Sequence, residues 1–567
     1  MNNASLELGG TNWAEKDGNI LGYSVGDTSG KYSPQEFTFA RGSNLSATRI
    51  DRAGLIVKGR ENLALQSNQF DTTWVNINSN ETSGQSGYDG SNDAWILSKS
   101  ASGGFIYQIA NSYSGVYTFS VYAKANASNF IRLNGNAVTD ADAFFNLSTG
   151  LVQSSINCID VKIESVGNGW YRCSITSNDS DLDYINIYPA EAGSISGNSG
   201  SVYIQDAQLE QGLAASPYIE SGATNGTAGV LENTPRLNYT TGVANPYLLL
   251  EPSRTNLVPQ SEYLQSWSGF GITLTTNYGI SPEGVKNATR FQTNAGVRGV
   301  IYDGVPVVNG STYILSMYVK SLSGNQKVRI GADLGCTNPQ GAETFDVGTE
   351  WIRVETTITS SQSSWNVFID NVESGINCTG TYLAADLLIY GFQVEQGSYP
   401  TSYIPTYSVS ATRANEITSK TGASDVIGQS EGTMFVEAKI EGIKNDNTLF
   451  SLHNGSFSQY LVISGNGSGL VNAYIFVGGV QQAGILSGVY AVGDVVKCAL
   501  AYKANDVAYY INGVQIGTDT SATMAATSQV DVGNLSFFSA PFQGHINQAE
   551  LYKERLTNAE LATLTTI

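Results

Sequence analysis

Two stretches of the sequence alternate in side-chain character over eight residues each, namely residues 117–124 (YTFSVYAK) and 313–320 (YILSMYVK). Successive strand residues point to opposite faces, so a period of two predicts half-buried β-strands. Elsewhere, short apolar runs are separated by Gly, Asn, Ser and Asp, which favour turns. The pattern predicts an all-β protein.

The two strands belong to an internal repeat, whose landmarks recur in the same order. The pairs are 62–67 (NLALQS) with 256–261 (NLVPQS), the two strands above, 169–172 (GWYR) with 350–353 (EWIR), and 207–212 (AQLEQG) with 392–397 (FQVEQG). Their offsets drift little, as expected when loops vary between matching strands. We therefore predict two β-sandwiches of jelly-roll type at 60–222 and 250–408, joined by a linker at 223–249.

A third unit is predicted at 409–567. In residues 507–516 (VAYYINGVQI), Asn512-Gly513 between two β-rich runs predicts a hairpin with a type I′ turn. Thr557 and Glu560 have capping-box spacing, which predicts a short terminal helix. Residues 1–59 contain too few apolar residues for a core of their own. We expect an extended N-terminal arm that packs on a neighbouring domain, an identical subunit or a larger particle.

Composition narrows the range of possible functions. The net charge of −20 disfavours nucleic-acid binding, because a phosphate backbone requires a basic face. No apolar stretch of about 18 residues is present to span a membrane. The start of the chain lacks the basic and apolar regions of a secretory signal, so we expect assembly in a cytosol. The five cysteines are odd in number and sparse, which disfavours a disulfide framework, although Cys158 and Cys173 could pair across neighbouring strands.

Two groups of residues resemble a pattern found in bacteriophage virion proteins. The first is 37–43 (FTFARGS) with 46–50 (SATRI), and the second is 234–239 (TPRLNY) with 248–257 (LLLEPSRTNL). In the usual pattern these pieces lie close together ahead of a carbohydrate-binding-module-like sandwich, whereas here the first repeat separates them. Residues 430–567 are similar to concanavalin A-like or laminin G-like domains, through 447–452 (NTLFSL), the Asn512-Gly513 hairpin and 544–546 (GHI).

These resemblances imply a non-enzymatic head or tail fiber or decoration protein, assembled in the host cytoplasm and displayed on the virion surface. It would contact other virion proteins through the N-terminal arm and glycans through its lectin-like sandwiches. By likeness to other phage fibers we expect a homotrimer. Two alternatives stay open: a purely structural capsid or tail decoration that binds only virion proteins, and a glycan depolymerase.

Glycan binding relies on aromatic faces that stack on sugar rings. Tryptophans present in both repeats are explained by folding, and we expect Trp74, Trp267, Trp170 and Trp351 in the cores. The unmatched Trp95 and Trp365 are better candidates for binding. The third unit has no Trp and offers Phe457, Tyr460 and Tyr474 instead.

Catalysis and metal binding have weaker signals. Glu210 and Glu395 occupy the same slot in the two repeats, which favours a place at a turn or strand end over a glycosidase carboxylate. A Ser/His/Asp arrangement could use only His453 or His545. Ca²⁺ prefers oxygen-rich clusters. The candidate clusters are Asp179, Asp181 and Asp183, which alternate along an extended chain, and the loop residues Asn445, Asp446 and Asn447.

Overall fold

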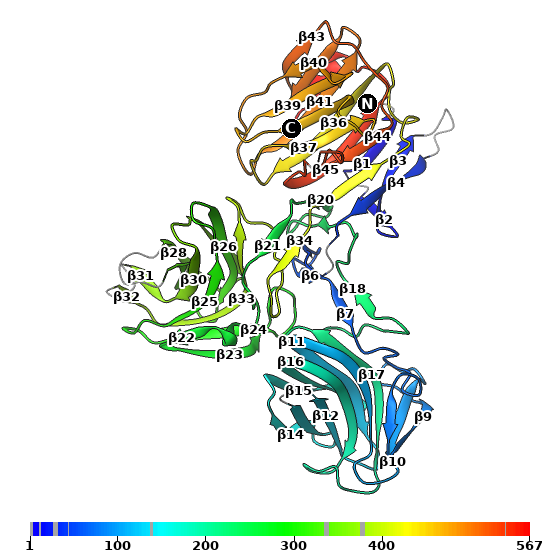
Figure 1. The fold of residues 1–567 in the computed structure, drawn as a ribbon, viewed down its shortest axis with the longest axis vertical. Helices are drawn as coiled ribbons and strands as arrows, with labels where there is room; N and C mark the ends of the chain where they lie inside the picture. The colour runs from blue at the N-terminus through cyan, green and yellow to red at the C-terminus, as the bar shows by residue number, and fades with distance from the viewer. Residues whose placement is uncertain are drawn as a thin grey trace. The chain divides into compact units, whose positions relative to one another are not determined.

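The structure, a computed structural model, describes residues 4–10, 13–25, 32–42, 45–136, 140–333, 340–374, 380–538 and 540–567. Strands dominate these residues, which confirms the predicted all-β class. The chain forms two compact units, each built from separate stretches of sequence (Figure 1). Unit 1 comprises Met1–Lys58, Val230–Arg254 and Thr412–Ile567, and unit 2 comprises Gly59–Gly229 and Thr255–Ala411. No helix in the described ranges is long and apolar enough to cross a membrane.

Unit 2 contains both repeats, and the second repeat is a sandwich of two five-stranded sheets. One sheet has the order β22 (Ser268–Phe270), β25 (Val300–Pro306), β30 (Ser364–Asp370), β27 (Gln326–Ala332) and β28 (Gln340–Val347). The other has the order β23 (Ile272–Gly279), β24 (Ala288–Thr293), β33 (Ala385–Gln396), β26 (Thr312–Ser321) and β29 (Ile352–Thr359). All pairings are antiparallel.

The first repeat has the same strand order with two further edge strands, β14 (Leu151–Ile156) and β15 (Asp160–Gly167), and two long strands, β11 (Phe105–Ala125) and β16 (Trp170–Ala190), take part in both of its layers. With them, one layer contains β8 (Val75–Ile77), β12 (Phe130–Asn136), β13 (Ala141–Asn146) and β14. The other contains β9 (Ser79–Gln85), β10 (Ala94–Lys99), β17 (Ser201–Gln211) and β15. The predicted tandem sandwiches are therefore confirmed.

The register between matching strands is also shared. The β11–β17 and β26–β33 ladders each shift by one residue, beyond Ser120 and beyond Ser316. Inside this bulge the backbone takes a left-handed φ, 54° at Asp206 and 66° at Gly391. A bulge residue needs this conformation to leave the pleat, and glycine adopts it without steric cost. The two repeats thus have the same local irregularity as well as the same topology.

Unit 1 is a sandwich that includes strands from the N-terminal residues, drawn in blue in Figure 1. β1 (Leu6–Gly9) pairs with β45 (Gly544–Tyr552), and β3 (Asn19–Val25) pairs with β1 and with β4 (Tyr32–Ala40). We expected residues 1–59 to form an extended arm of their own. In the structure they are part of unit 1 as far as Lys58, and the neighbouring domain is what they pack on. Alternating apolar residues bury one face of these strands, at Leu6, Leu8, Ile20, Phe37 and Phe39.

The expected linker at 223–249 likewise contributes to unit 1, because β20 (Tyr247–Leu250) pairs with β45. β45 continues a sheet of β36 (Glu431–Ile440), β41 (Val495–Lys503), β42 (Val507–Ile511) and β43 (Val514–Asp519). The facing sheet runs from β4 through β35 (Ile417–Lys420), β44 (Gln529–Val532), β37 (Asn447–His453), β38 (Gln459–Gly465) and β39 (Val471–Val477) to β40 (Val480–Ile485). β4 joins both sheets, since its first part pairs with β3 and its last part with β35.

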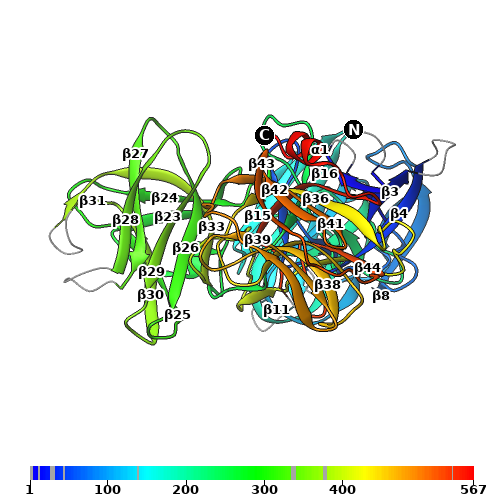
Figure 2. The same ribbon diagram turned by 90° about the horizontal axis from the view of Figure 1, so that it is seen from above.

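Two short-range predictions in unit 1 are confirmed. Residues Asn512-Gly513 connect β42 and β43 with positive φ at both positions. The helix α1 (Asn558–Leu564) begins after Thr557, which forms a reciprocal capping box with Glu560. α1 lies against β41 and β42 (Figure 2).

Five buried charged side chains connect the three segments of unit 1. Arg41 comes from the first segment, Arg236 and Glu251 from the second, and Arg413 and Glu416 from the third. Glu416 accepts hydrogen bonds from Arg41 at 3.0 Å and from Arg236 Nε at 2.6 Å. Glu251 pairs with Arg236 at 2.7 Å and with Arg413 at 3.1 Å. We call these five residues the charge cluster.

The N-terminal strands should be essential to the stability of unit 1. Phe37→Ala empties a fully buried site in its core and should cost about 3–5 kcal/mol. Hydrogen–deuterium exchange should then speed up in β45 but not in β17 of unit 2. Leu55→Ala, at a residue 37% exposed in the same segment, is the control and should change stability by less than about 0.5 kcal/mol. Unchanged protection of β45 in Phe37→Ala would show that residues 1–58 are dispensable.

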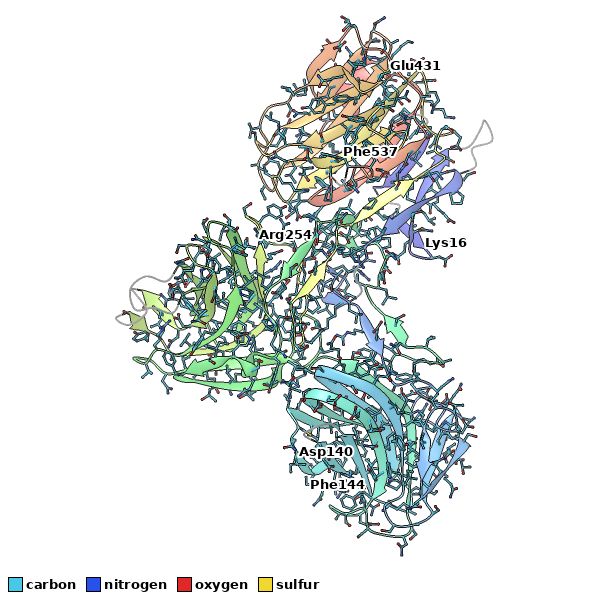
Figure 3. All side chains as sticks on the ribbon, in the orientation of Figure 1. Lys16, Asp140, Phe144, Arg254, Glu431 and Phe537 are labelled. Carbon is cyan, nitrogen blue, oxygen red and sulfur yellow. The ribbon has the colours of Figure 1, made fainter. Side chains whose placement is uncertain are left out.

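The charge cluster should be equally sensitive. Glu416→Gln leaves Arg41 and Arg236 buried beside a neutral side chain and should destabilise unit 1 by about 3–5 kcal/mol. The matched control is Glu36→Gln, which removes the solvent-exposed pair with Lys16, labelled in Figure 3, and should cost at most about 1 kcal/mol. Denaturant unfolding followed by exchange in β45 measures both; equal effects would rule out the cluster as a stabilising element.

Candidate functional site

Glu210 and Glu395 are structural residues, as their shared slot indicated. In each repeat the glutamate accepts a hydrogen bond from the glutamine two residues before it, Gln208 at 2.5 Å and Gln393 at 2.9 Å. Each also accepts a backbone N–H from the segment that closes the repeat, at 2.8 Å from Ser216 and 2.7 Å from Thr401. Buried acceptors with these partners fix the path of the closing segment.

A second matched residue, an asparagine, was not singled out from the sequence although it lies in the first landmark. Asn62 Nδ2 donates to the carbonyls of Ala207 and Ile219, and Asn256 Nδ2 donates to those of Phe392 and Ile404. The recurrence of an Asn before an apolar residue in both copies was the available signal. A buried amide that ties two strands together explains that recurrence.

The two unmatched tryptophans, Trp95 and Trp365, lie in the cores and not on binding surfaces. Trp95 packs edge-on against Phe70 with its indole N–H donated to the Asn68 carbonyl at 3.0 Å. Trp365 is 1% exposed and packs edge-on against Tyr313. In this state neither ring face is accessible to a sugar.

Of the tryptophans expected in the cores, Trp74, Trp267 and Trp170 are buried and Trp351 is half-buried. Trp74 and Trp267 also make the same hydrogen bond, from the indole N–H to the carbonyls of Gln66 and Gln260. A tryptophan present in both repeats is therefore a good sign of a position needed for folding. A tryptophan present in only one repeat is not a sign of an exposed position.

Both histidines lie in unit 1, and His453 is fully occupied by neighbours. Its Nε2 is 2.8 Å from Asp531 Oδ2, and its Nδ1 accepts the N–H of Gly455 at 2.9 Å. Burial acts to raise the pKa of the Asp531 carboxyl, but the hydrogen bonds that it accepts from His453 and from the Ser536 N–H hold it below its usual value. With both ring nitrogens engaged, His453 has no free nitrogen to activate a serine.

His545 stacks on Tyr247 with 3.5 Å between the ring centroids. Burial, followed by the charge of Lys439, lowers its pKa to about 3, so the ring is neutral at pH 7. It lines a pocket of about 310 Å³ together with Tyr247 and Glu437.

The predicted acidic cluster of Asp179, Asp181 and Asp183 is not assembled in the described part of the chain. No group of three or more His, Cys, Asp and Glu side chains is placed there to hold an ion. Asp183 accepts from Ser112 at 2.8 Å, while Asp179 is buried and accepts from Ser177, and burial raises its pKa. The ladder between β11 and β16 shifts register twice along this stretch, so regular alternation does not hold for Asp179, Asp181 and Asp183.

Of the loop residues, Asn445 and Asn447 have hydrogen-bond partners within the protein, and Asp446 has the backbone conformation of a bend. Asn447 is buried, donates to the Gly442 carbonyl and accepts the N–H of Gln543. Asn445 accepts the N–H of Gly467 at 3.0 Å. Asp446 has a φ of 56°, as the bend requires.

Cys158 and Cys173 are free thiols in the structure. Burial raises the pKa of Cys158 to about 11, so this thiol is protonated at pH 7. Cys336 and Cys378 lie outside the described residues.

Phe457 and Tyr460 belong to a cluster of aromatic side chains on the outer face of β38 and β39. Strand alternation directs Leu461 and Ile475 into the core, and so leaves Tyr460 and Phe476 on the opposite face. These two rings stack with 4.5 Å between their centroids and an interplanar angle of 11°. Tyr474, two residues before Phe476, lies on the same face and accepts a hydrogen bond from Asn472.

Two phenylalanines from the loop after β44 complete this cluster. Phe537, labelled in Figure 3, packs edge-on against His453 at 5.0 Å and against Phe457 at 4.9 Å. Phe538 packs edge-on against Phe457 at 5.3 Å. Phe457 is 54% exposed and Phe538 is 46% exposed, so both rings face solvent, while Phe537 packs against Phe457. We call Phe457, Tyr460, Phe476, Phe537 and Phe538 the aromatic patch.

The polar rim of the aromatic patch is the turn at 454–458, between β37 and β38. Asn454, Ser456 and Ser458 lie in this turn around Phe457 and are linked by hydrogen bonds of 2.7 to 3.3 Å among their side chains. No sequence pattern pointed to Phe537 and Phe538, because they reach the patch from a loop far along the chain. Only tertiary structure brings them to Phe457.

Comparison with known proteins gives structural neighbours only. No family model and no curated protein matches the sequence. A carbohydrate-binding module, CBM40, of the Ruminococcus gnavus IT-sialidase bound to α2,3-sialyllactose is 20% identical and covers 26% of this chain and 87% of its own, with a TM-score of 0.23. The tandem CBM22-1–CBM22-2 domain of Paenibacillus barcinonensis Xyn10C is 11% identical and covers 58% and 94%, with a TM-score of 0.19.

Domains LG4-5 of the mouse laminin α1 chain are 11% identical and cover 44% of this chain and 86% of their own, with a TM-score of 0.18. These neighbours are β-sandwich modules, as are the domains of this chain. Superpositions this partial transfer neither a ligand nor an activity.

Proposed function

We propose that this chain is an adhesion protein that binds glycans through the aromatic patch of unit 1 and is displayed on a bacteriophage particle. The observation that supports glycan binding is the pair of half-exposed rings Phe457 and Phe538, which pack against each other, with Phe537 packed against Phe457. Rigid aromatic faces suit the apolar faces of sugar rings, and a fixed ring loses little conformational freedom on binding.

The surroundings of the patch favour a sugar ligand. The amide of Asn454 and the hydroxyls of Ser456 and Ser458 lie beside Phe457 and provide partners for sugar hydroxyls. A continuous exposed aromatic surface on a folded domain generally marks an interaction site. Weak sites of this kind become effective when several copies act together on one particle, as in the expected homotrimer.

The placement on a particle is supported by the sequence motifs that resemble phage virion proteins. We expect attachment from residues 1–59, the arm predicted to pack on a neighbouring domain, an identical subunit or a larger particle, and their strands are built into unit 1. The attachment surface in this proposal is therefore the exterior of unit 1 as a whole.

The glycan proposal is tested on an array with the purified full chain, followed by calorimetric titration of the best ligand. Phe457→Ala and Phe538→Ala should each weaken binding about tenfold, because each removes one stacking face. Phe270→Ala is the matched control, since it removes an aromatic ring with 53% exposure from unit 2, and should bind as the wild type does. Wild-type affinity in both patch variants would refute this site.

The particle proposal is tested separately by electron microscopy. Gold-labelled antibodies against the purified chain should decorate intact phage particles in a lysate that contains the protein, at heads or tails. Label confined to unassembled material would contradict the placement and leave the glycan result unaffected.

A further inference from the structure

The two repeats of unit 2 share strand order, register and buried polar ties, so a place where they differ is not explained by folding. One such place lies at the ends of the matching strands β10 and β24. Ser98 lies opposite Ser201 in the first repeat, and Gln292 lies opposite Asp386 in the second. By this register Lys99 corresponds to Thr293.

In the first repeat this place is filled by the loop at 191–200. Lys99 has a fully buried side chain that pairs with Glu191 at 3.3 Å and donates to the Ile195 carbonyl at 3.1 Å. Its backbone N–H also donates to the Gly200 carbonyl at 2.9 Å. The loop is therefore bound to the strand end.

In the second repeat the same place is a cleft of about 560 Å³. It lies at the start of β23, the end of β24 and the start of β33, which are labelled in Figure 1. Thr293 occupies the position of Lys99, and its hydroxyl is bound to the Leu383 carbonyl and to the Ala385 N–H. A volume in this range is typical of small-molecule sites.

The lining of the cleft is polar but carries little net charge. The side chains of Gln292, Asn294 and Gln326 supply amides, and Ile272 supplies an apolar surface. Among the described residues of the lining, Asp386 alone is charged.

The Asp386 carboxylate is held in place and its charge is compensated. Arg290 donates to both of its oxygens at 2.7 Å, and the guanidinium of Arg290 lies 4.5 Å from the ring centroid of Tyr278. The backbone N–H of Asp386 donates to Gln326 Oε1 at 2.6 Å. The carboxylate therefore presents fixed acceptor lone pairs without a strong unpaired charge.

We propose that this cleft is a second saccharide site, separate from the aromatic patch, which takes an uncharged sugar segment. The amides of Gln292 and Asn294 and the carboxylate of Asp386 hydrogen-bond its hydroxyls, and Ile272 contacts the apolar face of a ring. This proposal rests on the proposed function only in that both assume a saccharide ligand. In the first repeat the loop held by Lys99 and Glu191 lies at this place.

The test uses the full chain and uncharged tri- and hexasaccharides of glucose, galactose, mannose, xylose or arabinose, with binding followed by calorimetry and saturation-transfer NMR. Asp386→Asn replaces one acceptor oxygen by an NH2 donor and Asn294→Ala removes an amide, so each should weaken binding of the tightest sugar about five- to tenfold. Asn294 is exposed, so Asn294→Ala should leave thermal unfolding unchanged. Ser98→Ala, at the position of the first repeat that matches Gln292, is the control and should bind as the wild type does.

The outcomes separate the two sites. Loss of affinity in the cleft variants but not in Phe457→Ala supports the cleft. Loss in Phe457→Ala alone assigns the glycan to the aromatic patch and overturns the cleft. No binding of any member of the panel at millimolar concentration to the wild type also overturns the cleft, while charged glycans on the array still test the patch.

Discussion

The buried charge cluster is the interaction on which unit 1 depends. Three arginines and two glutamates lie out of solvent, and such charges are tolerated only when each has partners in the interior. Arg41 precedes the first repeat, Arg236 and Glu251 lie between the repeats, and Arg413 and Glu416 follow the second. The chain leaves unit 1 twice to form a sandwich, and the cluster joins the ends where it departs and returns.

This arrangement gives a physical meaning to the sequence motifs that resemble phage virion proteins. Arg41 lies in the first motif, and Arg236 and Glu251 lie in the second. We found the motifs split by the first repeat, which looked like a departure from the usual pattern. Because the motif residues meet in one cluster, the inserted sandwich separates them in sequence but not in unit 1. The motif residues therefore hold the segments of unit 1 together, and they carry no information about a ligand.

The sequence allowed the strands, the repeat, the Asn512-Gly513 hairpin and the capped terminal helix to be predicted, because each depends on local pattern. The N-terminal strands were harder, since residues such as Leu6 and Phe37 look too few for a core until β45 and β35 are beside them. For the candidate site, the sequence pattern could not show which side chains are buried. Trp95 and Trp365 are unmatched between the repeats, yet local partners bury both.

Comparison of the repeats separates folding from function only when it is applied to places in the structure and not to residue types. Asn62 and Asn256 are identical because they tie the same strands, and Glu210 and Glu395 because they hold the same closing segment. At Lys99 and Thr293 the backbone is shared but the space above it is not. The cleft in the second repeat presents a fixed carboxylate among amides, a lining that suits the hydroxyls of the sugar that we propose for it.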